Sequence, residues 1–363
     1  MSNTLSDELY MRRALELAQK GRYTARPNPK VGCVLVRENT IVGEGWHERA
    51  GAPHAEINAL HQAGISANGS TAYVTLEPCA HHGKTPPCCD ALINAGINRV
   101  VIASEDPYPQ VNGKGVERLR KAGINVEIGL LRKEAEELNC GFLSKIRRGR
   151  PWVRAKIGMS LDGRAVSDDG RPNWIISTRS REDVHQWRLS SCAILTGIGT
   201  VLADDPQLTA HVPNDKNLTP IRIILDSHLR IPLEAKVLDQ TASTLIVHRP
   251  NAKEVTLPSH INRLSINTCD NRINLKMLLE ELGNRGLNDL FVEAGPTLTS
   301  SLLEKGLIDE LLVYTTPRLL GDQAQPMITA NIYPRFPEAS PTLKLIENIQ
   351  IDTDVRLRFR PII

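Results

Sequence analysis

The sequence predicts an α/β protein with two domains. Short β-like runs alternate with helical runs along most of the chain, a pattern typical of sheets covered by helices. A length of 363 residues suits two domains of roughly 150 residues each. A basic stretch at residues 145–151 interrupts the alternation, and we interpret it as a solvated linker rather than a phosphate-binding segment. We therefore predict one domain at residues 1–149 and a second at residues 150–363.

The composition excludes several classes of protein. Lysine and arginine total 44 residues against 41 aspartates and glutamates, so no basic surface is expected for nucleic acid or an anionic membrane. No apolar run approaches the ~18–20 residues of a membrane span, and the N-terminus lacks the features of a signal peptide. Seven cysteines are too few, and odd in number, for a disulfide framework. We expect a cytoplasmic protein in which clustered cysteines are candidate metal ligands.

The first half of the chain predicts a three-layer α/β domain. Its first helix covers residues 6–20, with Ser6 as the N-terminal cap and Gly21 at the end. Two β-like runs at residues 31–36 and 41–46 form a hairpin. Further strands are expected at residues 71–76, 99–103 and 126–128. Further helices are expected at residues 55–63, 87–95, 116–122 and 132–138.

The second half restarts the alternation as a second α/β domain. Strands are expected at residues 152–157, 193–196, 221–225, 244–247, 290–292 and 311–314, and helices at residues 179–189, 275–282 and 298–305. Gly295 and Pro296 form a turn from a strand into a helix N-terminus, which is a favourable place for an anion. Gly197 and Gly199 resemble the start of a dinucleotide-binding fingerprint, but no third glycine follows. A standard Rossmann domain is therefore not supported.

Three metal-binding residue types stand at the ends of predicted elements in the first half. His54 opens a helix, Cys79 follows a strand, and Cys88 opens the next helix. The dipole at a helix N-terminus favours a thiolate over a thiol. One imidazole and two thiolates form a zinc set whose fourth position is free for water, as a catalytic zinc requires. Cys89 is the alternative to Cys88, since adjacent residues point in different directions and one ligand is expected.

Glu56 lies two residues after His54 and is not needed as a ligand. From the first turn of its helix it can take a proton from a zinc-bound water and deliver it to a leaving amine. A His-x-Glu followed by Pro-Cys and a second Cys is the signature of zinc-dependent base deaminases. The shortest form of that signature has two residues between the cysteines, whereas this chain has eight. A lone motif of this kind arises by chance, but the complete set favours a catalytic zinc.

The quoted motifs carry a resemblance to a known family. His54-Ala55-Glu56, the segment at residues 78–88 (PCAHHGKTPPC) and the loop at residues 28–32 (NPKVG) resemble the bifunctional deaminase–reductases of riboflavin biosynthesis. The long spacing between the cysteines is normal for that family, and the likeness covers essentially the whole chain. It implies a cytidine-deaminase-like domain followed by a dihydrofolate-reductase-like domain.

The resemblance implies two consecutive reactions. The first domain would use zinc to hydrolyse the 2-amino group of 2,5-diamino-6-(ribosylamino)pyrimidin-4-one 5′-phosphate. The second would use NADPH to reduce the ribosyl group, giving 5-amino-6-(5-phosphoribitylamino)uracil. The implied partner is therefore a small phosphorylated pyrimidine, and a homodimer is implied by the family alone.

The resemblance also implies which residues line the sites. The base and phosphate of the deaminase substrate would be held by Asn28, His47, His81 and Lys84. The NADP site would be lined by Met159, Trp174, Thr200, Asp204, Ser227, Gly295, Pro296, Thr297, Leu298, Thr299, Ser300 and Ser301. The reductase substrate would be faced by Arg188, Leu208, His211 and Glu293. The alternatives are a solvated loop for the deaminase contacts, core packing for Leu208 and Trp174, and a surface salt bridge for Arg188.

The chain departs from the family pattern at two positions. Pro172 stands where many members have a polar residue, and His211 stands where many have arginine. A neutral histidine binds phosphate more weakly than a bidentate arginine, so the phosphate contacts of the second domain are left open. Two competing hypotheses are a nucleoside or tRNA-base deaminase with an unrelated C-terminal domain, and a zinc-stabilised nucleotide-binding or regulatory protein.

Overall fold

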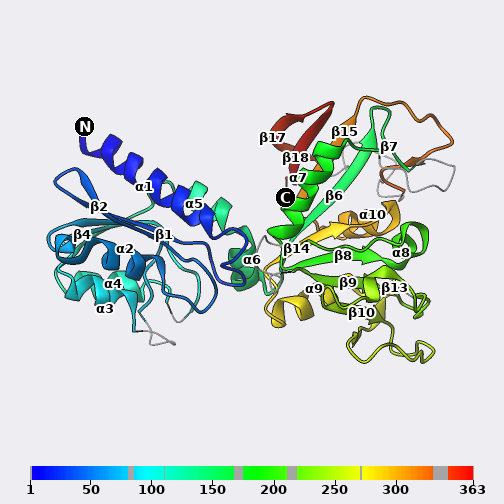
Figure 1. Ribbon diagram of the computed structural model, residues 1–363, viewed down its shortest axis with the longest axis horizontal. Helices are drawn as coiled ribbons and strands as arrows, with labels where there is room; N and C mark the ends of the chain where they lie inside the picture. The colour runs from blue at the N-terminus through cyan, green and yellow to red at the C-terminus, as the bar shows by residue number, and fades with distance from the viewer. Residues whose placement is uncertain are drawn as a thin grey trace. The chain divides into compact units, whose positions relative to one another are not determined.

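The computed structural model describes residues 2–80, 86–109, 111–166, 175–210, 219–269, 272–329 and 342–362. The chain divides into two compact units, residues 1–149 and residues 150–363 (Figure 1). No helix in the described part of the chain is long and apolar enough to cross a membrane. Each unit has its own sheet and its own hydrophobic core, so each is described by itself.

The first unit is built on a five-stranded mixed sheet. In spatial order its strands are β2 (Thr40–Trp46), β1 (Gly32–Arg37), β3 (Thr71–Leu76), β4 (Arg99–Ser104) and β5 (Asn125–Ile128). Strands β1 and β2 form the predicted hairpin, and the left-handed φ angles of Glu38 and Asn39 are those of a two-residue type I′ turn. Strand β1 runs antiparallel to β3, whereas β3, β4 and β5 are parallel. The carboxyl ends of β3 and β4 therefore meet at one edge of the sheet.

Helices cover both faces of this sheet (Figure 1). One face packs against α1 (Ser2–Lys20) and α5 (Arg132–Leu138). The other face packs against α2 (Ala55–Ala63), α3 (Cys88–Asn94), α4 (Lys114–Lys121) and the 3₁₀ turn η1 (Gly64–Ala67). A Cβ atom on Gly45 would lie 2.2 Å from the Ala55 carbonyl oxygen, so glycine is required where α2 begins against β2. This close approach fixes the start of the helix that carries His54.

Two predictions about the first unit are wrong, one about the start of a helix and one about the basic stretch. Ser6 lies inside α1 and does not cap it, because the helix begins at Ser2. The basic stretch is not a linker for most of its length, since residues 140–148 form helix α6 (Cys140–Arg148). Buried Leu143 anchors α6, and its basic residues lie near its C-terminus, where the helix dipole favours them. Gly149, with φ of 70°, ends the helix.

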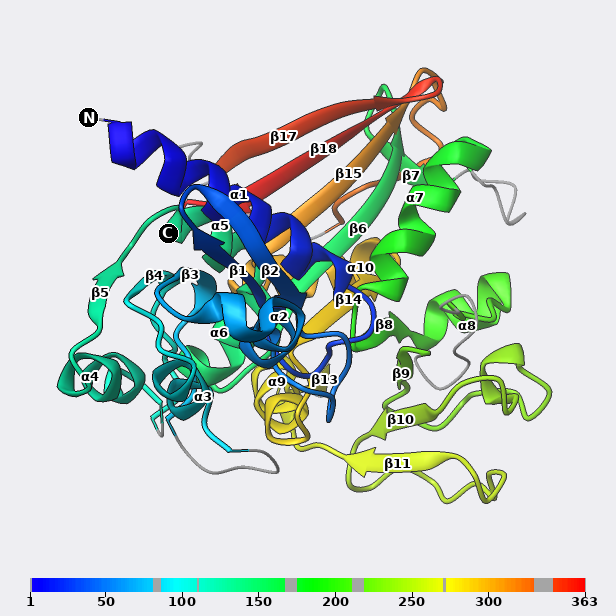
Figure 2. The same cartoon turned by 60° about the vertical axis from the view of Figure 1, so that its left-hand side comes forward.

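The second unit is built on a nine-stranded sheet (Figure 2). In spatial order its strands are β11 (Asn262–Ser265), β10 (Thr244–His248), β9 (Ile221–Leu225), β8 (Ala193–Gly197), β14 (Asp289–Glu293), β6 (Trp152–Ser160), β15 (Glu310–Thr316), β18 (Asp354–Pro361) and β17 (Leu343–Ile351). The first seven are parallel, and the hairpin β17–β18 adds an antiparallel edge. The carboxyl ends of the seven parallel strands therefore share one edge.

Helices also cover both faces of the second sheet. One face packs against α9 (Leu275–Asn284) and α10 (Pro296–Glu304). The other packs against α7 (Thr178–Leu189), which Ser177 caps, and α8 (Ile198–Asp204). The remaining short elements are η3 (Lys236–Leu238), the ribbon β12 (Thr268–Cys269) with β13 (Arg272–Ile273), and the ribbon β7 (Arg164–Val166) with β16 (Gln325–Pro326). This alternation of parallel strands and helices is the predicted α/β pattern.

A buried carboxylate holds three strands of the second sheet together. Glu310 on β15 is fully buried and pairs with Arg154 on β6 and with Arg358 and Arg360 on β18, at 2.6, 2.9 and 3.0 Å. The guanidinium of Arg154 also stacks on the ring of Trp187, 4.5 Å from its centroid. Burial alone would raise the pKa of Glu310, but the paired arginines outweigh it and hold the pKa at about 2.

We expect the second unit to lose stability as the pH falls from 4.5 towards 2. The folded pKa of Glu310 is about 2 and its ordinary value is 4.5, so its stabilising contribution is complete above pH 4.5 and is lost on acidification. Glu310→Gln should lower the free energy of unfolding at pH 7 by about 3 kcal/mol and flatten its acid dependence. Urea unfolding followed by tryptophan fluorescence measures both effects.

The matched control is Glu281→Gln, which removes an exposed i,i+4 ion pair with Arg285 in the same unit. That variant should unfold within about 0.5 kcal/mol of the parent at every pH. A Glu310→Gln protein as stable as the parent at pH 7 would contradict the prediction.

Candidate active sites

The first unit brings His54, Cys79 and Cys88 together. Their ligand atoms lie within 4.8 Å of one another. The His54 Nδ1 atom is 3.2 Å from Cys88 Sγ and 3.6 Å from Cys79 Sγ. Typical zinc–nitrogen and zinc–sulfur bonds at tetrahedral angles would place these atoms about 3.6 Å apart. The donor set and its spacing therefore fit zinc with one coordination position left over.

Three elements position these donors. His54 is the N-cap residue of α2, Cys79 follows the end of β3, and Cys88 is the first residue of α3. The Cys88 backbone N–H donates to Cys79 Sγ at 3.3 Å, as expected for a thiolate at a helix N-terminus. The choice between neighbouring cysteines is also resolved, because Cys89 lies in the hydrophobic core and its thiol donates to the Pro78 carbonyl.

The two cluster thiols differ in acidity. A hydrogen bond from the Cys88 thiol lowers the pKa of Cys79, and hydrogen bonds from His54 and from the Cys88 backbone N–H lower it further. Burial of the Cys79 side chain opposes this effect but does not reverse it. Cys79 is therefore the more acidic of the two thiols.

Glu56 lies beside the metal cluster on the first turn of α2. Its side chain is only 3% exposed, and its carboxyl group forms a hydrogen bond with Cys88. Burial raises the pKa of Glu56, and the nearby His54 partly offsets this effect. A buried carboxyl group with a raised pKa can both accept and donate a proton near neutral pH.

His47 and Asn28 form a polar pair next to the cluster. The His47 ring packs edge-on against the His54 ring, with 5.5 Å between centroids. His47 Nδ1 lies 3.2 Å from the Pro53 carbonyl oxygen. Because a carbonyl oxygen can only accept, Nδ1 carries the proton of the neutral ring, and Nε2 accepts from the Asn28 amide at 3.1 Å. Burial lowers the pKa of His47, which favours this neutral form. Two of the expected substrate contacts thus lie together, whereas His81 and Lys84 lie outside the described residues.

Sequence reasoning missed Glu77, two residues before Cys79. Its buried carboxylate accepts four backbone N–H groups, from Asp106, Gly113, Gly115 and Val116, at 2.9–3.3 Å. These bonds tie the end of β3 to the connection between β4 and α4. Glu77 directly precedes Pro78-Cys79, but nothing in the sequence indicates where its four partners lie.

In the second unit, two helices begin at the carboxyl ends of neighbouring strands. Gly197 is the N-cap of α8 after β8, and Gly295 is the N-cap of α10 after β14. Pro296 is the first residue of α10, so the helix begins two residues before the predicted start at residue 298. Among the described residues, a Cβ atom at Gly295 would meet nothing within 4 Å, so those residues leave space beside this helix N-terminus. Free N–H groups beside open space fit the phosphates of a dinucleotide.

The other residues of the expected NADP site fall into two groups. Met159 on β6, Thr200 and Asp204 on α8, and Ser227 after β9 are partly or fully exposed. Within α10, Thr297 is exposed and Leu298 is partly buried, whereas Thr299 and Ser300 are buried and their hydroxyl groups bond to the Ala294 carbonyl and the Thr329 N–H. The Ser301 hydroxyl donates to Thr297. Trp174 lies outside the described residues.

Arg188 and Glu293, both expected to face the reductase substrate, pair with each other. Arg188 Nε and Nη2 both donate to the Glu293 carboxylate, the second at 2.9 Å, and both side chains are largely buried. Arg188 is therefore not in an exposed surface salt bridge. Leu208 is 3% exposed and packs in a core cluster, so its side chain is part of the core. His211 lies outside the described residues.

Lys156 is a second residue that sequence reasoning missed. It lies on β6 directly beside Glu293 on β14, and its charge interacts with those of Arg188 and Asp204. Burial lowers the pKa of Lys156, against an opposing effect of Glu293. The alternation of side chains along β6 indicates one face of the sheet but not the neighbour on β14, so only the strand register reveals this cluster.

Comparison with known proteins decides the family. The family described as "Cytidine and deoxycytidylate deaminase zinc-binding region" matches residues 4–104, and "RibD C-terminal domain" matches residues 151–357. The riboflavin biosynthesis protein RibD of Escherichia coli K12 is 47% identical over 97% of this chain and 99% of its own length. The chain belongs to the RibD family. The RibD protein of Haemophilus influenzae is 44% identical over 98% of this chain and 97% of its own.

Solved RibD structures share the fold of the whole chain. Acinetobacter baumannii RibD superimposes with a TM-score of 0.90 at 43% identity, covering 99% of this chain and 100% of the other. The Thermotoga maritima diaminohydroxyphosphoribosylaminopyrimidine deaminase/5-amino-6-(5-phosphoribosylamino)uracil reductase gives a TM-score of 0.89 at 33% identity, with the same coverage. The predicted α/β fold class and the predicted family are confirmed. The chain is a bifunctional deaminase and reductase of riboflavin biosynthesis, with zinc and NADPH as cofactors.

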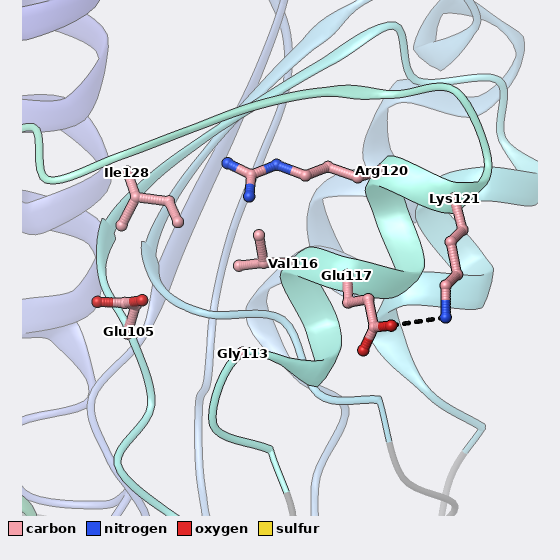
Figure 3. Close-up of a pocket in the computed structure, with 7 residues that line it drawn as sticks. All are labelled: Glu105, Gly113, Val116, Glu117, Arg120, Lys121 and Ile128. Atoms are coloured by element: carbon pink, nitrogen blue, oxygen red, sulfur yellow. Dashed lines mark ion pairs between the residues drawn. The ribbon is translucent and has the colours of Figure 1, made fainter.

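The first unit has a surface hollow of about 470 Å³ (Figure 3), and none of His54, Cys79 and Cys88 lines it. It lies between α4 and the ends of β4 and β5, and its charged side chains are already engaged. Glu117 pairs with Lys121 at 2.6 Å, Glu105 pairs with Arg132 at 3.0 Å, and Arg120 donates to the Val126 carbonyl. None of the predicted site residues that the structure describes lines this hollow, so we assign it no function.

Proposed function

We propose that residues 1–149 deaminate 2,5-diamino-6-(ribosylamino)pyrimidin-4-one 5′-phosphate and that residues 150–363 then reduce its ribosyl group to ribityl. The observation that carries the proposal is the convergence of His54, Cys79 and Cys88 beside the buried carboxyl group of Glu56. The substrate names of the Thermotoga maritima relative support the choice of pyrimidine. The product is 5-amino-6-(5-phosphoribitylamino)uracil.

In the deaminase, His54, Cys79 and Cys88 would hold a zinc ion. Bound zinc supplies Lewis acidity that lowers the pKa of water to near neutrality. Glu56 accepts a proton from the attacking water and passes it to the amine, which leaves as ammonia. Its burial keeps this proton from exchanging freely with solvent. His47 and Asn28, with fixed hydrogen-bonding directions, orient the pyrimidine ring.

In the reductase, the ends of β8 and β14 hold the cofactor and the ends of β6 and β14 hold the sugar. Bound NADPH supplies a hydride to the sugar carbon. The Arg188–Glu293 pair is rigid because both of its side chains are largely buried, and it orients the ribosyl group. Lys156 gives a proton to the ring oxygen that is released from the reduced carbon. Its lowered pKa makes it a better proton donor than an exposed lysine.

We also propose that the enzyme acts in the cytoplasm. None of the seven cysteines, all of which lie in the described part of the chain, forms a disulfide, which suits a reducing compartment.

We expect Glu56→Gln to lower the kcat of deamination by at least about 100-fold, because glutamine cannot relay the proton. The metal ligands are untouched, so zinc should remain at one ion per chain by plasma mass spectrometry. Reduction of the purified deaminated intermediate by NADPH should be unaffected. Cys79→Ser is the contrasting variant and should lose both zinc and deamination, since a serine hydroxyl is a poor zinc ligand. Substantial ammonia release by zinc-loaded Glu56→Gln would refute the mechanism.

We expect Lys156→Met to lower the kcat of reduction by about 100-fold, because methionine keeps the apolar stem but cannot donate a proton. The dissociation constant of NADPH, measured by fluorescence titration, should change less than about threefold. The matched control is Lys276→Met, an exposed lysine on α9. An unchanged kcat in Lys156→Met would show that the proton comes from elsewhere.

We further propose a homodimer formed through the hairpin β17–β18. β17 lies at the edge of the sheet and exposes apolar side chains, including Leu345 and Ile349, while Val355 is exposed on β18. A long apolar edge strand tends to pair with another strand, and a second copy offers a self-complementary one.

Sedimentation velocity should show a dimer for the parent and a monomer for Ile349→Asp, because a buried charge prevents the edge strands from pairing. Leu233→Asp, which changes a leucine that is exposed elsewhere in the same unit, should remain dimeric. A monomeric parent at micromolar concentration would rule out the dimer.

A further inference from the structure

Asn139 is a buried polar residue at the junction of α5 and α6. Its side chain is 3% exposed, and it lies beyond residues 4–104, which the zinc-binding-region family covers. Its backbone is fixed on both sides, since its N–H donates to the Glu136 carbonyl and its carbonyl accepts from the Leu143 N–H, each at 3.0 Å. The side chain therefore projects from a rigid helical junction.

The amide group of Asn139 pairs with the backbone of Lys30. Asn139 Oδ1 accepts from the Lys30 N–H at 2.8 Å, and Asn139 Nδ2 donates to the Lys30 carbonyl at 2.9 Å. The two residues are 109 positions apart in sequence. An amide side chain carries a donor and an acceptor side by side and can satisfy both polar groups of one residue. Aspartate has no donor for this purpose, and an apolar side chain has neither group.

Lys30 lies in the loop that carries Asn28. This loop has no helix or strand of its own between the turn at Ala25 and the start of β1. The Asn28 N–H donates to the Ala25 carbonyl at 2.9 Å, and the Val31 carbonyl accepts from the His47 N–H at 2.9 Å. Pro29, between them, has no N–H to donate. The two bonds from Asn139 therefore fix the middle of the loop to the body of the unit.

The same loop contacts the metal cluster through Asn28. The Asn28 amide is 3.1 Å from His47 Nε2, and the His47 ring packs edge-on against the ring of the metal ligand His54. A shift of Lys30 would move Asn28 relative to His47 and so relative to the metal.

We propose that Asn139 is a positioning residue for deamination: it fixes the loop that carries Asn28 against the metal site. It acts through the backbone of Lys30. The inference rests on the proposed role of Asn28 in orienting the pyrimidine. It also brings the connection between α5 and α6, close to the end of the first unit, into the deaminase machinery.

The test is Asn139→Leu, which keeps the volume of the side chain but removes both hydrogen bonds. We expect the KM of deamination to rise about tenfold while kcat changes less than about twofold. Zinc content and the reduction of purified intermediate by NADPH should equal those of the parent and show that the variant is folded. If the Asn139→Leu variant lacks zinc, the same measurements are made on Asn139→Ala. The matched control is Cys140→Ala at the same junction, which leaves the bonds to Lys30 intact and should behave like the parent.

A double-mutant cycle with Asn28→Ala separates this inference from the proposed function. If Asn139 acts through Asn28, Asn28→Ala alone should also raise KM about tenfold. The KM of the double variant should then be no higher than that of either single variant. A parental KM in Asn139→Leu, or effects that multiply in the double variant, would overturn the inference. If Asn28→Ala has a parental KM, the role of Asn28 fails and the inference fails with it, while Glu56→Gln still tests the deaminase.

Discussion

Both sites depend on the same physical feature, a helix N-terminus placed at the carboxyl end of a strand. In the first unit α2 and α3 begin at His54 and Cys88, beside the end of β3. In the second unit α8 and α10 begin after Gly197 and Gly295, at the ends of neighbouring parallel strands. The N–H groups and the dipole at a helix N-terminus favour negative charge, which suits the thiolates of the first unit and, in the site that we propose, a phosphate of NADPH in the second. The same backbone arrangement therefore suits the chemistry proposed for each unit, metal binding in the first and cofactor binding in the second.

Buried carboxylates hold the surroundings of these sites in place. Glu77 gathers four backbone N–H groups beside Cys79, Glu293 is paired with Arg188, and Glu310 is paired with three arginines. A buried charge is costly unless it is paired or hydrogen-bonded, so removing one partner leaves a large penalty. Each carboxylate therefore strongly disfavours other arrangements of the strands and loops around it. The uncharged side chain of Asn139 also fixes a loop, because its amide group bonds to both the N–H and the carbonyl of Lys30.

Much of the architecture could be predicted because it depends on local patterns. Hydrophobic periodicity located most strands of both parallel cores, and turn residues located most helix ends. Among the elements that escaped prediction are the start of α1, the helices α6 and α8, the strand β11 and the hairpin β17–β18. Helix α6 is rich in basic residues, and β17 exposes side chains on both faces, so neither shows the clear alternation that identifies a half-buried element.

The sequence by itself predicted His54 and Cys79 as zinc ligands and Glu56 as the proton carrier, because these residues sit at fixed offsets from predictable element ends and match a chemical signature. Only the tertiary structure selected Cys88 over Cys89, since the choice depends on which side chain faces the core. It alone placed Lys156 beside Glu293 and Asn139 against Lys30. Those contacts join residues more than 100 positions apart, and their distances depend on strand register and helix packing, which no local pattern encodes.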